Sequence, residues 1–128
     1  MKKPSVSEIM AQYSDKYIYI WTSNQNKFYA MEKVRRIGVP RELKDSRKEI
    51  DTFRMFHEIG HMETYGPKQT KAQREYNATQ WAIDEFNRRG LRLKEEYWEL
   101  WQNYIYSFTK AKDKSRFDLD WGVMEMPF

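Results

Sequence analysis

Residues 45–66, DSRKEIDTFRMFHEIGHMETYG, predict the central helix of the fold. Ser46 and Glu49 have the S-x-x-E spacing of a capping box, which marks a helix start. Apolar residues then recur every three or four positions, as one face of a helix requires, at Ile50, Phe53 and Phe56. Gly66, followed by proline, is a stop signal. We therefore expect a helix that buries one face and ends before Gly66.

The same stretch contains both histidines of the chain, His57 and His61, with Glu58 directly after the first. Residues four positions apart lie on one face of a helix, so both imidazoles can point at a single atom. This is the H-E-x-x-H pattern, in which the two histidines hold Zn²⁺ and the glutamate acts as a base. We expect His57 and His61 to be metal ligands and Glu58 to be a catalytic residue.

A catalytic zinc site needs a third protein ligand. The metzincin pattern would require glycine at position 64 and histidine at position 67, where this chain has Thr64 and Pro67. Because the chain has no cysteine and no third histidine, the ligand is expected to be a carboxylate.

The next predicted helix, residues 70–90, offers Glu75, with small residues at Ala78 and Ala82 that allow close packing against the first helix. Glu75 is therefore the favoured third ligand, as in the His₂Glu sites of thermolysin-like enzymes. Asp84 and Glu85 lie farther along the same helix and are the alternatives.

The remaining pattern predicts an α+β chain. Residues 16–22 alternate aromatic and β-branched side chains and predict a strand, and residues 27–34 predict a returning strand of a hairpin. Residues 38–43, GVPREL, predict a loop. Two further helices are expected, a short one beginning after Ser5 and a long one within residues 93–112. The architecture is a small antiparallel sheet or hairpin beside three to four helices.

Composition limits the class of protein. A chain of 128 residues fits one domain, here 1–128, with 113–128 as a tail of no clear period. No apolar run approaches the roughly 20 residues of a membrane span, and the lack of cysteine fits the cytoplasm. The net charge of +4 is spread among acidic residues, so nucleic acid is not expected as a direct ligand.

The segment DTFRMFHEIGH, followed by EYNATQWA, resembles the ImmA/IrrE family of metallopeptidases and small phage or mobile-element proteins with the same HEIGH helix. In that family the second helix has an E-x-x-A pattern and an aromatic–alanine pair, matched here by Glu75, Ala78, Trp81 and Ala82. The arginine of this chain follows the phenylalanine instead of preceding it, and no Leu-Met-Pro segment follows the second helix. The resemblance implies a minimal zincin-like domain with one Zn²⁺ held by His57, His61 and Glu75.

These patterns together predict a zinc metallopeptidase, a hydrolase that cuts a peptide bond in a specific protein or peptide substrate. The resemblance suggests a transcriptional repressor as that substrate. Tyr65 and Tyr76 flank the site in sequence and are candidate donors to the developing oxyanion. The alternative is a non-catalytic zinc-binding module that acts through protein interaction.

Overall fold

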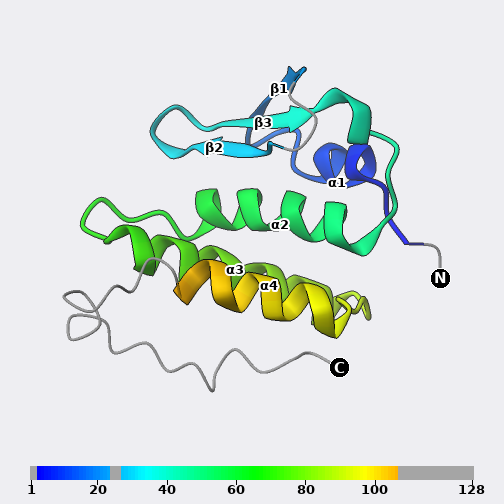
Figure 1. Ribbon diagram of the computed structural model, residues 1–128. Coiled ribbons are helices and arrows are strands. Elements are labelled where there is room, and N and C mark those ends of the chain that lie inside the picture. The colour runs from blue at the N-terminus through cyan, green and yellow to red at the C-terminus, as the bar shows by residue number, and fades with distance from the viewer. Residues whose placement is uncertain (1–2, 24–26, 107–128) are drawn as a thin grey trace.

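The computed structural model describes residues 3–23 and 27–106, and within them the chain forms four α-helices and a three-stranded sheet (Figure 1). The predicted α+β class and the number of helices are confirmed. The elements in chain order are α1 (Val6–Gln12), β1 (Ile18–Thr22), β2 (Tyr29–Met31), the 3₁₀ turn η1 (Glu32–Val34), β3 (Arg36–Pro40), the 3₁₀ turn η2 (Arg41–Leu43), α2 (Glu49–Glu63), α3 (Lys71–Arg88) and α4 (Glu95–Tyr106).

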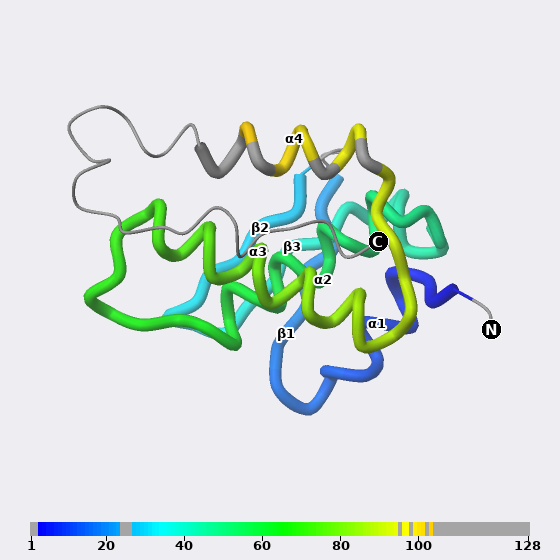
Figure 2. The backbone as a smooth tube through the Cα atoms, turned by 90° about the horizontal axis from the view of Figure 1, so that it is seen from below, coloured from blue at the N-terminus to red at the C-terminus, as the bar shows by residue number. Residues whose placement is uncertain are grey.

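Helix α2 is the middle layer of the molecule. The sheet and α1 lie on one side of it, and α3 and α4 lie on the other (Figure 1). From the perpendicular direction, α4 runs along one side of the helical layer and β1 lies toward the opposite side (Figure 2). The residues of α2 are therefore buried along most of its length, as the central helix of a small domain requires.

The strand order is β1-β3-β2, so β3 lies between the two strands that precede it. β1 pairs with β3 in parallel, with Ile18 opposite Arg36, and β2 pairs with β3 antiparallel, with Tyr29 opposite Gly38. The predicted hairpin between residues 16–22 and 27–34 is wrong, because these two strands are not neighbours. The sheet is mixed, not purely antiparallel.

The predicted loop at residues 38–43 is also wrong for Gly38–Pro40, which belong to β3. Ile37 and Val39 point toward the helices and are fully buried, which supplies the driving force for a strand. Gly38 faces the other side, where a Cβ atom would come within 2.0 Å of the Tyr29 ring. Gly38 thus lets the aromatic ring of Tyr29 lie across β3. Because glycine is common in turns, the sequence at this position favoured a loop although it forms part of a strand.

Capping boxes begin two of the helices, formed by Ser5 and Glu8 at α1 and by Thr70 and Gln73 at α3. The box predicted at Ser46 and Glu49 does not form. Helix α2 begins after Lys48, and Ser46 Oγ instead donates to the Asp51 carboxylate at 2.6 Å.

The core lies between α2 and both of its neighbouring layers. Aromatic rings dominate it, since Phe86 of α3 meets Phe53 and Phe56 of α2 edge-to-face, with ring centroids 5.1 and 5.8 Å apart. The other fully buried large side chains come from four segments and are Val6, Ile9, Ile37, Val39, Met55, Ile59 and Leu93. This packing fixes the position of α2 relative to α3, and hence the position of the site.

The described part of α4 ends at Tyr106, and the predicted tail at 113–128 lies outside the described residues. None of the helices described has the length and apolar character that crossing a bilayer demands.

Candidate metal centre

His57, Glu58 and His61 lie on α2, and Glu75 lies in the second turn of α3. Gly60 of α2 allows the two helices to approach at this level, since a Cβ atom on it would lie only 2.5 Å from the backbone oxygen of Ala78. The short glutamate of α3 therefore reaches both histidines of α2.

Three potential ligand atoms converge in a nearly equilateral triangle. His57 Nε2 lies 2.9 Å from Glu75 Oε2, His61 Nε2 lies 3.1 Å from the same oxygen, and the two Nε2 atoms are 3.1 Å apart. Ligands about 2.0–2.1 Å from a tetrahedral ion are separated by roughly 3.3 Å, so the triangle is close to the size that such an ion needs. The three residues are buried and are a group that could hold a metal ion.

Burial and mutual contact set the protonation of these groups. Burial lowers the pKa of His57 to about 4, so its imidazole is neutral at physiological pH. Burial alone would raise the pKa of Glu75, but hydrogen bonds with His57 and His61 outweigh it and hold that pKa well below the usual range. A neutral imidazole and an ionised carboxylate are the forms that bind metal.

His61 shows the opposite direction. Burial opposes its protonated form, but contacts with Glu75 and the nearby Glu58 and Glu32 carboxylates prevail and raise its pKa. The negative charge of this cluster therefore favours the protonated form of His61. A bound cation would take the place of that proton.

The outward-facing nitrogens of the two histidines also have partners. The buried Thr79 hydroxyl lies 3.1 Å from His57 Nδ1, within hydrogen-bond distance. Glu32 Oε1 lies 3.7 Å from His61 Nδ1, at ion-pair distance. Such partners at Nδ1 orient the ring and leave Nε2 to face the metal. The Trp101 ring of α4 covers His57 with a centroid distance of 4.5 Å.

Glu58 is buried but outside the ligand triangle. Burial raises its pKa to about 7, against the opposing charges of His61 and Arg54. Its Oε2 is buried and has no hydrogen-bond partner, which for an isolated buried carboxylate is costly and needs an explanation. A carboxylate with a proton affinity near neutrality is suited to general acid–base work.

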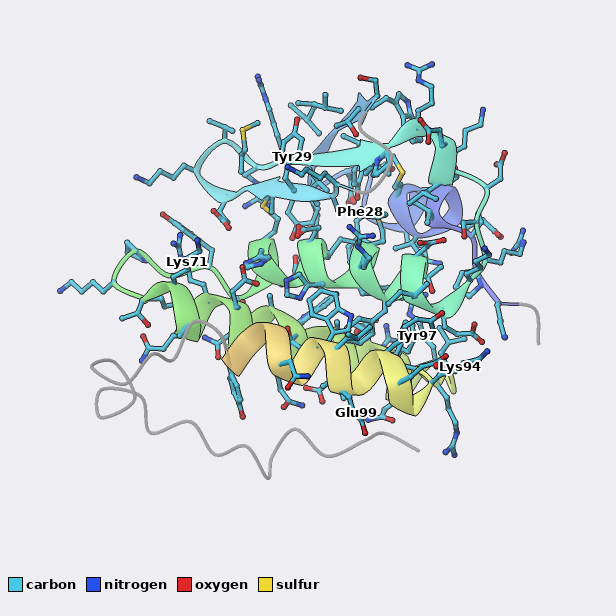
Figure 3. All side chains as sticks on the ribbon, in the orientation of Figure 1. Phe28, Tyr29, Lys71, Lys94, Tyr97 and Glu99 are labelled. Carbon is cyan, nitrogen blue, oxygen red and sulfur yellow. The ribbon has the colours of Figure 1, made fainter. Side chains whose placement is uncertain are left out.

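Two cavities flank Glu58 and meet at Phe28, which lies between the sheet and α2 in Figure 3. The first cavity, of about 360 Å³, lies toward the start of α2, and its walls are Phe28, Ile50, Arg54, His57, Glu58, Leu100 and Trp101. The second, of about 390 Å³, lies toward the start of α3, and its walls are Phe28, Tyr29, Ala30, Glu32, Glu58, His61, Lys71, Arg74 and Glu75. The candidate centre is therefore open to molecules from two sides.

The other sequence-predicted residues lie elsewhere. Asp84 is exposed and accepts a hydrogen bond from Gln80, and Glu85 pairs with Arg88 and Arg89. Neither belongs to the metal-binding group found among the described residues. Among the three carboxylates that the sequence offered as the third ligand, Glu75 is thus the one that lies beside both histidines.

Tyr65 and Tyr76 line neither cavity. Tyr76 packs against the apolar core, and Tyr65 follows α2 and is partly buried. Their role as oxyanion donors stays a prediction.

Fold and site together define an α+β protein with a buried group of two histidines and one glutamate that could bind a metal ion. No match was found among known family models, among curated proteins or among solved structures. The resemblance to the ImmA/IrrE family therefore remains a prediction.

Proposed function

We propose that this protein is a zinc-dependent peptidase of the minimal zincin-like type. The observation that carries the proposal is the convergence of His57, His61 and Glu75 beside the buried, unpaired carboxylate oxygen of Glu58. A structural metal site has no use for a further carboxylate that is not a ligand, whereas hydrolysis needs a base next to the metal.

The residues fit Zn²⁺. Two imidazole nitrogens and one carboxylate oxygen are the donor set of catalytic zinc sites, which keep a further coordination position for water or substrate. His57, His61 and Glu75 would hold the ion, with Thr79 and Glu32 orienting the two imidazoles. When bound, Zn²⁺ supplies Lewis-acid chemistry, in that it polarises a carbonyl and acidifies water.

Glu58 carries the proton in this mechanism. Its carboxylate takes a proton from the attacking water and later gives a proton to the nitrogen of the leaving amine. Because Glu58 lines both cavities, it faces the substrate on each side of the bond that is cut.

The substrate is held in the cleft that the two cavities form. β2 is an edge strand of the sheet and lies directly above α2 in Figure 1. Its residues Tyr29 and Ala30 line the second cavity, together with the preceding Phe28. An extended peptide would pair with this edge, which is the usual way that a sheet edge binds a peptide. A specific protein, such as the repressor that the family resemblance suggests, would supply that extended segment.

Two variants and one control test the proposal. Glu58→Gln is expected to keep about one zinc per chain and to lose hydrolysis of a random peptide library. Glu75→Ala is expected to bind zinc more than about 100-fold more weakly, since loss of a ligand exceeds the effect of losing its orienting partner. Glu42→Gln, at an exposed position of η2, is the control and should match the wild type.

Zinc content is measured by elemental analysis and cleavage by mass spectrometry. Wild-type protein that contains zinc but cuts no peptide in the library would contradict the proposal. Hydrolysis by Glu58→Gln at the wild-type rate would contradict the role given to Glu58.

A non-catalytic zinc-binding module is the second candidate. The observation that favours it is the outer face of the sheet, which carries the exposed apolar side chains of Ile18, Tyr29 and Met31 and is covered by none of the helices in the described ranges (Figure 1). Exposed apolar groups of this kind are common at protein interfaces. Under this function, Glu58→Gln would leave every activity of the protein intact.

A further inference from the structure

A positively charged side chain, Arg54, lines the first cavity next to the proposed catalytic groups. Arg54 precedes His57 by three residues and Glu58 by four, so all three lie on one face of α2. Arg54 is partly buried and lines the cavity together with both of them. Its guanidinium lies over the Phe28 ring, 5.0 Å from the ring centroid. The aromatic ring therefore holds the cation at the side of the cavity that faces the sheet.

The remaining walls of this cavity are apolar. Ile50 comes from α2, and Leu100 and Trp101 come from α4. An arginine among such side chains is partly removed from water, which strengthens its attraction for an anion. The guanidinium also offers a planar fork of donors that matches a carboxylate.

The second cavity differs in charge. Lys71 and Arg74 line it, but so do Glu32 and Glu75, so it offers no single sign of charge. Figure 3 shows Lys71 at the end of α3 that lies away from Lys94 and Tyr97 of the α4 region. The two sides of Glu58 are thus chemically distinct, because in the first cavity Glu58 is the only carboxylate beside the cation, whereas in the second Glu32 and Glu75 also oppose the cations.

We propose that the first cavity binds a carboxylate-bearing residue of the substrate, directly beside the bond that is cut, and that Arg54 selects it. The inference rests on the proposed peptidase function. The carboxylate has two possible sources, an Asp or Glu side chain within the peptide or the free carboxyl terminus of its last residue. Arg54 is a specificity-determining residue in this scheme, while Glu58 remains the proton carrier.

The first test uses binding and needs no turnover. The probes are peptide hydroxamates that place an Asp, an Asn or a Lys side chain beside the metal-binding group, and their Kd is measured with the zinc-loaded full chain. The Asp compound should bind about tenfold or more tightly than the Asn compound, as expected for a hydrogen bond between charged groups. Arg54→Glu should reverse the order and favour the Lys compound.

Arg36→Glu is the matched control, because it makes the same charge change at an exposed position of β3. It should preserve the preference for Asp. Equal binding of the three probes to the wild type would overturn the inference, as would an Asp preference that survives Arg54→Glu. A protein that binds no zinc would overturn both the inference and the proposed function.

The second test identifies the source of the carboxylate. A random peptide library is cleaved in two forms, with free and with amidated carboxyl termini. Enrichment of Asp or Glu next to the cut in both forms would identify a side chain as the source of the carboxylate. Removal of single residues from the free form alone would identify the carboxyl terminus as the source. Cleavage with neither pattern would overturn the inference and leave the peptidase function in place. Absence of cleavage with a retained Asp preference among the hydroxamates would overturn the peptidase function and leave the first cavity as a carboxylate-binding site.

Discussion

Gly60→Ala tests whether the close approach of α2 and α3 assembles the site. The added Cβ atom would lie 2.5 Å from the backbone oxygen of Ala78, against the 3.4 Å of an ordinary contact, so the helices must separate locally by about 0.9 Å. Overpacking of this kind costs about 1–3 kcal/mol, and a backbone atom cannot rotate away, which places Gly60→Ala at the upper end. Alanine is more favourable than glycine in a helix interior by about 1 kcal/mol, which offsets part of this cost. The expected net loss in the free energy of unfolding is about 2 kcal/mol.

The same displacement separates Glu75 from the two histidines. Ligand atoms now 2.9–3.1 Å apart would no longer form a triangle of the size that zinc needs, and zinc affinity should fall by about 10- to 100-fold. Urea unfolding followed by circular dichroism gives the stability, and competition with a chelator gives the affinity. Gly66→Ala is the control, because its Cβ would lie nearest to side-chain atoms of Gln69, at 3.2 Å or more, and would not press on a backbone atom as at Gly60. If Gly60→Ala matched the wild type in both measurements, the close-approach explanation would be refuted.

Three further results are expected. Thr79→Val, which removes the hydroxyl 3.1 Å from His57 Nδ1, should weaken zinc binding by about 10-fold or more while Thr79→Ser restores it, as chelator competition would show. Zinc affinity should fall as the pH is lowered, beginning above 6.5, because the raised pKa of His61 lets a proton compete with the metal for its imidazole. A zinc Kd that stays constant as the pH is lowered would contradict this. Phe86→Ala should lower the free energy of unfolding by about 3–5 kcal/mol, since the fully buried ring contacts two other phenylalanines, and a urea midpoint near that of the wild type would exclude this role.

The grouping of His57, His61 and Glu75 was predictable because it depends on local geometry. Helical spacing places the histidines on one face, and small residues after Glu75 indicate close packing of the next helix. Thr79 also carried a usable signal, since it lies four residues after Glu75 and hence on the same face of α3. Its buried hydroxyl could have been assigned to the site on that basis.

The strand order and the contribution of Glu32 were not predictable in this way. β1 and β3 are neighbours in the sheet although β2 lies between them in the sequence, and no local pattern encodes which strand lies in the middle. Gly38 and Pro40 gave β3 the composition of a loop, although burial of Ile37 and Val39 stabilises it as a strand. Glu32 approaches His61 only because this sheet is placed above α2.

The position of the ligands along the chain has a consequence for folding order and for evolution. His57 and Glu75 are only 18 residues apart, in consecutive helices, so their contact has a low sequence separation and is expected to form early. Three of the seven residues that line the first cavity lie instead outside this helical hairpin, with Phe28 before it and Leu100 and Trp101 after it. During synthesis the two helices that carry the metal-binding residues, α2 and α3, are complete before α4 has left the ribosome. Mutations in the outlying segments can therefore change which peptides bind while the metal-binding hairpin is inherited intact.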